Sequence, residues 1–125
     1  MQSVHVESKD DVAILWIDNP PVNALSFHVL AGLLDAVERL QGETGIAGMI
    51  LASRNRIFIA GADIKEFDQA PKAPSLRDVL AAMERSTKPI VAAIDGAALG
   101  GGLEVALSCD ERVVTRRARL GLPEI

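Results

Sequence analysis

Residues 89–108 read Pro-Ile-Val-Ala-Ala-Ile-Asp-Gly-Ala-Ala-Leu-Gly-Gly-Gly-Leu-Glu-Val-Ala-Leu-Ser, and this stretch carries the clearest fold signal in the chain. Its first part, residues 89–94, is a short apolar run typical of a buried strand, and residues 103–108 form an apolar helical stretch. Residues 96–102 between them predict a flexible loop of small residues. A strand, a glycine-rich loop and a helix in this order favour an α/β fold.

The rest of the chain also alternates strands and helices. Two helices are predicted over 27–41, with Ser26 as N-cap, and over 76–85, with Ser75 as N-cap. The predicted strands are residues 3–8, 12–17, 46–52, 112–115 and 118–121. The first two strands are joined by a short turn and predict a hairpin. Helices between the later strands predict parallel crossovers.

Composition limits the functional classes. The chain has 125 residues, of which 49% are apolar, and a formal net charge of -4, which gives no general attraction for nucleic acid or anionic membrane. No apolar run is long enough for a membrane span. The single cysteine excludes an intramolecular disulfide and favours a reducing compartment. His5 and His28 lack metal-ligand spacing, so we expect no metal site.

Two small-residue loops are candidates for ligand binding. Gly100–Gly102 precede a helix, whose N-terminal amides suit a phosphate or a developing oxyanion; the alternative is a tight turn with close helix packing. Residues 58–67 contain the small run Ala60-Gly-Ala62, whose amides can face a ligand, and Lys65, which can reach a phosphate. The alternative for this segment is a plain strand-to-helix turn.

Glu104 and Glu124 are candidates for a catalytic pair of carboxylates. Glu104 lies just inside the helix after the glycines, and Glu124 follows Pro123. Two carboxylates that face one small space can share a water and act as base and acid. Taken singly, Glu104 also suits a helix N-terminus and Glu124 a surface position.

Several other side chains have structural interpretations. Cys109 follows an apolar helix and is expected to be a buried thiol, and Trp16 is expected in the core. The four arginines in the last third favour a solvated face, with a partner surface or a phosphate contact as the alternative. They are Arg112, Arg116, Arg117 and Arg119.

Residues 58–65, 96–106 with Cys109-Asp110, and 121–125 together resemble the enoyl-CoA hydratase/isomerase (crotonase) superfamily, in order and in spacing. The resemblance implies a crotonase-like spiral of ββα units, of which the chain covers about the first half. Residues 19–26 are most similar to the N-terminal hydratase/isomerase domain of multifunctional β-oxidation proteins, in which a dehydrogenase part follows. We therefore expect residues 1–125 to be the N-terminal part of one such domain, apparently truncated after Ile125.

The resemblance also implies a role for each candidate residue. Ala62 and Gly101 match the two backbone amides of the oxyanion hole, and Glu104 and Glu124 match the glutamates that activate and deliver water. Ala60, Asp63 and Ile64 match the path of adenine and pantetheine, and Lys65 matches a basic position near the CoA phosphates. The implied substrate is a coenzyme A thioester, and no prosthetic group or metal is implied.

The predicted function is therefore hydration of trans-2-enoyl-CoA in fatty-acid β-oxidation, with Δ3-Δ2-enoyl-CoA isomerase activity as an option at the same site. The alternatives are another acyl-CoA reaction of the family, such as hydrolysis or decarboxylation, and an inactive fragment or acyl-CoA-binding scaffold. A glycosidase that uses the two carboxylates is a weaker alternative, because the glycine-rich loop would have no role in that reaction. We expect a homotrimer or a dehydrogenase part on the same parent chain, and a cytoplasmic location, or a peroxisomal one in a eukaryote.

The 125 residues alone are expected to have little or no hydratase activity. In that state apolar surface over residues 105–107 and around Leu120 should be exposed and favour association.

Overall fold

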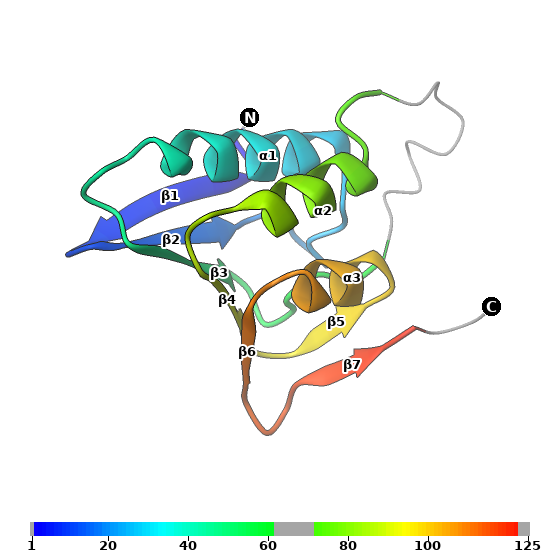
Figure 1. The fold of residues 1–125 in the computed structure, drawn as a ribbon. Coiled ribbons are helices and arrows are strands. Elements are labelled where there is room, and N and C mark those ends of the chain that lie inside the picture. The colour runs from blue at the N-terminus through cyan, green and yellow to red at the C-terminus, as the bar shows by residue number, and fades with distance from the viewer. Residues whose placement is uncertain (1, 62–71, 123–125) are drawn as a thin grey trace.

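The computed structural model describes residues 2–61 and 72–122, and Figure 1 shows their arrangement. The elements in chain order are β1 (Val4–Lys9), β2 (Val12–Ile17), α1 (Phe27–Gln41), β3 (Gly48–Ser53), α2 (Leu76–Arg85), β4 (Ile90–Ile94), β5 (Ala97–Leu99), α3 (Gly101–Leu107), β6 (Glu111–Val114) and β7 (Arg119–Gly121). Within these residues no helix is both long and apolar enough to cross a membrane.

Five strands form one sheet in the order β1-β2-β3-β4-β6, and β5 pairs with β7 in a second, smaller sheet (Figure 1). β1 and β2 are antiparallel, which confirms the predicted hairpin, and Asp10 takes a positive φ of 56° in its turn. β2 to β3, β3 to β4 and β4 to β6 are parallel pairs, so the predicted crossovers are confirmed. β5 and β7 are also parallel.

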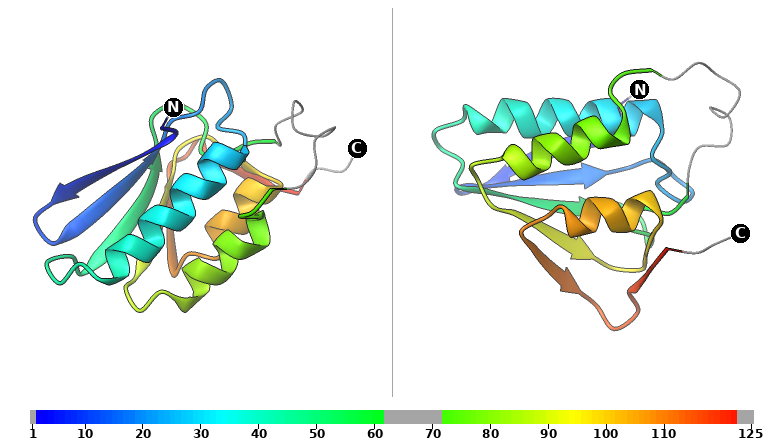
Figure 2. Two further views of the ribbon diagram at one scale, coloured as in Figure 1. Left: turned by 90° about the horizontal axis from the view of Figure 1, so that it is seen from above. Right: turned by 45° about the vertical axis from the view of Figure 1, so that its right-hand side comes forward.

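Both long helices begin and end where the sequence predicts. Ser26 caps α1 by accepting from the Val29 N–H, and Ser75 forms a capping box with Asp78 at the start of α2. Each cap satisfies amides that have no partner within the helix, which is worth about 1 kcal/mol. In the described part of the chain, α1, α2 and α3 lie on the same side of the five-stranded sheet (Figure 2).

The core lies between this sheet face and the helices. It contains Leu15 on β2, Leu51 on β3 and Leu33 on α1, each at most 2% exposed. Burying such a side chain contributes roughly 1.5–3 kcal/mol to the free energy of folding.

The prediction that Trp16 belongs to the core is wrong. Successive side chains of a strand point to opposite faces. Ala13, Leu15 and Ile17 face the helices, so Trp16 points to the other face and is only half-buried. Its indole Nε1 donates to Glu7 at 2.8 Å, and the Arg54 guanidinium lies 4.5 Å from its ring centre.

The last third differs from prediction in two places. The loop expected over 96–102 contains strand β5, and α3 begins inside the glycine run at Gly101 rather than at residue 103. Exposed apolar surface is confirmed at Leu107, 59% exposed, and Leu120, 44% exposed. The prediction is wrong for Val105 and Ala106, which are fully buried because this short helix turns both side chains toward the core.

Candidate active site

Residues 57–61 run beside β5 and are held there by main-chain hydrogen bonds. The Phe58 and Ile59 amides both donate to the Ala97 carbonyl, at 2.9 and 3.1 Å, and the Leu99 amide donates to the Ile59 carbonyl at 3.0 Å. The side chains of Phe58 and Ile59 are fully buried. The Ala60 amide donates to the Val22 carbonyl at 2.9 Å, so the segment is fixed on two sides.

Two glycines permit this close packing. A Cβ atom on Gly102 would lie 2.2 Å from the Ile59 carbonyl oxygen, and one on Gly96 would lie 1.9 Å from the Arg56 carbonyl oxygen. Gly96 also has a φ of +103°, which side chains disfavour. Glycine at position 102 therefore lets the first turn of α3 lie directly against Ile59.

The first turn of α3 has main-chain amides that can bind a ligand. Gly100 takes a φ of 60° and accepts from the Glu104 amide, at 3.1 Å, through its carbonyl. Within residues 2–61 and 72–122 no acceptor pairs with the Gly101 amide. A first-turn amide at the positive end of a helix suits an oxygen that carries negative charge.

Glu104 projects from the same short helix and is exposed. The Gly100 amide donates to the Gly121 carbonyl at 3.0 Å, so the end of β7 lies at the N-terminus of α3. Glu124 follows three residues later and lies outside the described residues.

The structure thus describes three of the predicted site residues and brings their elements together. Ala60 is half-buried beside Val22, and Gly101 starts the helix that packs against Ile59. The others, Ala62, Asp63, Ile64, Lys65 and Glu124, lie outside the described residues.

Sequence reasoning missed Asn23, which is fully buried and takes a positive φ of 53°. Its side-chain amide donates to the carbonyls of Ile57 and Phe58, both at 2.9 Å, and to the Ser53 hydroxyl at 2.7 Å. Its Oδ1 accepts from the Asn55 side chain at 3.0 Å. The Asn23 network consists of Asn23, Ser53, Asn55 and the carbonyls of Ile57 and Phe58. In the sequence, an Asn that follows two prolines gave no sign of partners 30 or more residues away.

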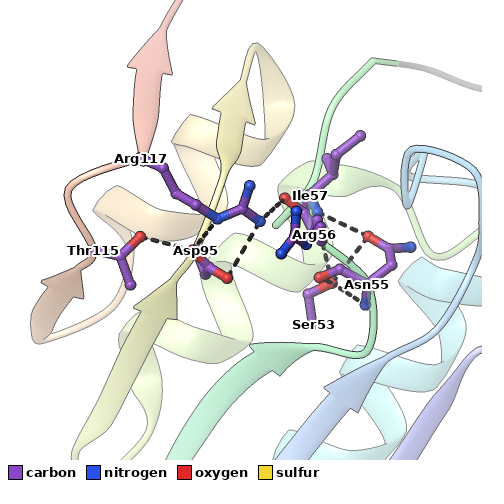
Figure 3. A network of polar contacts seen from close by, with 7 residues as sticks. All are labelled: Ser53, Asn55, Arg56, Ile57, Asp95, Thr115 and Arg117. Atoms are coloured by element: carbon purple, nitrogen blue, oxygen red, sulfur yellow. Dashed lines mark hydrogen bonds and ion pairs between the residues drawn. The ribbon is translucent and has the colours of Figure 1, made fainter.

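A second polar group missed by sequence reasoning is the Arg117 network, which contains Asp95, Thr115, Arg117 and the Arg56 carbonyl (Figure 3). Arg117 Nε lies 2.6 Å from Asp95 Oδ1, and Arg117 Nη2 donates to the Arg56 carbonyl at 2.9 Å. The Thr115 hydroxyl donates to the same carboxylate at 2.7 Å. The hydrogen bonds from Arg117 and Thr115 lower the pKa of Asp95.

The remaining predictions concern Cys109, the arginines and metals. Cys109 is buried as predicted, and burial raises the pKa of its thiol to about 12. All four arginines are exposed, but Arg117 pairs with Asp95, and Arg112 donates to the carbonyls of Ala106 and Cys109. In the described part of the chain, no group of three or more His, Cys, Asp or Glu is arranged to hold a metal ion.

Comparison with known proteins shows the family. The family model described as enoyl-CoA hydratase/isomerase matches residues 7–125, so the chain belongs to the enoyl-CoA hydratase/isomerase family. The chain has 33% sequence identity to a solved structure of Pseudomonas aeruginosa DspI. The two superpose with a TM-score of 0.89 over 99% of this chain and 54% of that one. The family and the structural match together define the crotonase fold.

Two curated relatives match nearly all of this chain but only part of their own length. The peroxisomal bifunctional enzyme of Danio rerio is 44% identical over 117 residues, which cover 94% of this chain and 16% of that protein. The probable enoyl-CoA hydratase of Bacillus subtilis is 40% identical over 132 residues, which cover all of this chain and 51% of that protein. The chain therefore spans about half the length of one relative and much less of the other.

Proposed function

We propose that this chain contributes the oxyanion site and the acid/base pair of an enoyl-CoA hydratase that adds water to trans-2-enoyl-CoA in fatty-acid β-oxidation. The observation that carries the proposal is the contact between Gly102 and Ile59. It sets the N-terminus of α3, where the Gly101 amide has no acceptor among the described residues, beside segment 57–61, which precedes Ala62 in the sequence. The name of the Bacillus subtilis relative supports the reaction, and relatives named as fatty acid beta-oxidation multifunctional proteins support the pathway.

In the proposed mechanism, water attacks the β-carbon of the conjugated thioester and negative charge builds on the thioester oxygen. The amides of Ala62 and Gly101 donate to that oxygen and stabilise the enolate. Losing one such donor costs about 3–4 kcal/mol in related oxyanion sites. Glu104 and Glu124 divide the remaining work, one taking a proton from water and the other giving one to the α-carbon.

The same proposal covers substrate binding and location. Ala60, Asp63 and Ile64 line the path of adenine and pantetheine, and Lys65 pairs with a CoA phosphate. The CoA thioester is the substrate, and no prosthetic group takes part. We further propose that residues 1–125 form the N-terminal part of one hydratase/isomerase domain. In a eukaryote the protein is peroxisomal, as the name of the Danio rerio relative suggests, and in a bacterium it is cytoplasmic.

The test uses the natural gene product that carries this sequence, assayed for hydration of crotonyl-CoA. Glu104→Gln and Glu124→Gln should each lower kcat by about 100-fold or more, because positioned general acids and bases contribute about 10²–10⁴-fold. Glu111→Gln is the matched control, since Glu111 is an exposed glutamate on β6. Unchanged kcat in either site variant would remove that residue from the mechanism.

Isomerase activity is a second candidate, favoured by the family to which the chain belongs. One carboxylate suffices to move an allylic proton, so one of the two variants should lose hydration and still isomerise a 3-enoyl-CoA. Loss of both reactions in both variants would refute this. A panel of other acyl-CoA thioesters would reveal hydrolysis or decarboxylation, and CoA binding without turnover would indicate a scaffold.

A further inference from the structure

Three consecutive main-chain carbonyls accept hydrogen bonds from side chains that are distant in sequence. The Arg56 carbonyl accepts from Arg117, and the carbonyls of Ile57 and Phe58 accept from Asn23. The Ile57 carbonyl also accepts from the Ser53 hydroxyl at 2.6 Å. These bonds fix the start of the segment that continues through Ile59 and Ala60 toward the proposed oxyanion site.

The Asn23 network is built to hold one geometry. Its central side chain is fully buried, and both of its polar atoms have partners on the 53–58 stretch. Asn55 is fixed in turn, because its amide donates to the Ser53 hydroxyl at 3.0 Å and its Oδ1 accepts from the Ile57 amide at 2.9 Å. A buried polar group that loses its partner costs free energy, so these carbonyls have one favoured position.

The Arg117 network holds the same stretch from its outer side. Its guanidinium joins the Asp95 carboxylate, one residue after β4, to the Arg56 carbonyl, as Figure 3 shows. Both side chains of the ion pair are about half exposed, at 43% and 52%. An exposed pair contributes little to stability, but a planar guanidinium fixes the direction of each partner it holds.

We propose that Arg117 and Asn23 are positioning residues for the thioester oxygen. They hold the carbonyls of residues 56–58, and through them they set the distance between segment 59–61 and the Gly101 amide. This inference rests on the proposed function, since it assigns the two networks to the oxyanion site of that reaction. Two amides stabilise a developing charge only when both point at it, so a small shift of one lowers kcat more than it changes substrate binding.

The main test is Arg117→Ala in the natural gene product, with Arg116→Ala as control. Arg116 is also exposed and directly precedes Arg117, and its replacement by alanine removes the same charge. Arg117→Ala should lower kcat for crotonyl-CoA hydration roughly 5- to 20-fold with little change in KM, because a misplacement of about 1 Å costs about 10²-fold. The amides of Ile59 and Ala60 should exchange hydrogen faster than in the wild type, and Arg116→Ala should match the wild type in both measurements.

Asn23→Asp is the second variant. Aspartate has nearly the same shape but cannot donate to the carbonyls of Ile57 and Phe58. The measurement is the ¹³C NMR signal of the labelled carbonyl carbon of a bound thioester. In the variants that remain folded this signal should shift upfield relative to the wild type, because a less polarised carbonyl carbon is more shielded. A loss of stability alone would leave that signal unchanged.

The outcomes separate the two claims. A wild type that does not hydrate crotonyl-CoA would refute the proposed function, and hydrogen exchange would still decide whether Arg117 holds residues 59 and 60. Equal exchange in the two arginine variants would overturn the inference. So would faster exchange with unchanged kcat, or a rise in KM alone.

Discussion

Gly102→Ala tests the contact on which the candidate site depends. The added Cβ would lie 2.2 Å from the Ile59 carbonyl oxygen and 2.8 Å from the Ile59 Cβ. An ordinary contact is about 3.4 Å or more, so α3 and segment 57–61 must separate by about 1 Å. Overpacking of this kind costs about 1–3 kcal/mol, of which about 1 kcal/mol returns because alanine favours a helix. The net loss of stability should be about 0–2 kcal/mol.

The effect on activity should be larger than the effect on stability. A separation of about 1 Å between the two proposed oxyanion donors predicts about a 10²-fold fall in kcat. The measurements are the thermal unfolding midpoint and the hydration of crotonyl-CoA by the natural gene product. Gly45→Ala is the control, because Gly45 has no atom within 4 Å of its added Cβ. If Gly102→Ala matched Gly45→Ala in both measurements, the proposed packing of α3 would be wrong.

Three further predictions follow from single side chains. Lys88→Met removes the ammonium that donates to the carbonyls of Leu40 and Glu43 at the end of α1. The free energy of unfolding, measured by chemical denaturation, should fall by about 1–2 kcal/mol. The control Lys9→Met, at an exposed lysine, should change it very little. Cys109 should react slowly with iodoacetamide at pH 8 until the protein is unfolded, because burial raises its pKa to about 12. Asp95 has a lowered pKa in the fold, so its contribution to stability is present above pH 4 and is lost as the pH falls through the folded pKa. Asp95→Asn should therefore unfold at a lower temperature than the wild type at pH 7, and this difference should shrink as the pH falls below about 4, the usual pKa of an aspartate.

The sequence predicted best those elements whose signals are local. α1 and α2 begin and end at the predicted residues, because a serine cap and a helical apolar period lie within each segment. β5 was missed because its three residues are too few to show a period, and its partners, Ile59 and β7, come from distant parts of the chain. The direction of Trp16 was misjudged for a related reason: alternation along β2 separates two faces, but only the tertiary fold shows which face the helices cover.

In the candidate site, too, features with a local sequence signal were predicted and features without one were missed. The alternative interpretation of the glycine run, a tight turn with close helix packing, is confirmed by the contact between Gly102 and Ile59, whereas its role in ligand binding stays a prediction. Asn23 and Arg117 were not identified, because their partners lie 22 to 61 positions away along the sequence and include main-chain carbonyls that no residue type reveals. Every residue has a main-chain carbonyl, so a side chain that donates to one does not require any particular residue type at the other position, and the sequence shows no matching pair.

These two kinds of contact act together on the segments around the proposed site. At Gly96 and Gly102 the absence of a side chain sets how close two segments lie, and at Asn23 and Arg117 a side chain sets which way the carbonyls point. Closeness without direction would leave an amide turned away from its ligand, and direction without closeness would leave it out of reach. The proposed oxyanion site needs both, so a change at either kind of position should lower kcat in excess of its effect on stability. A set of variants in which kcat merely followed stability would show that these contacts support the fold alone.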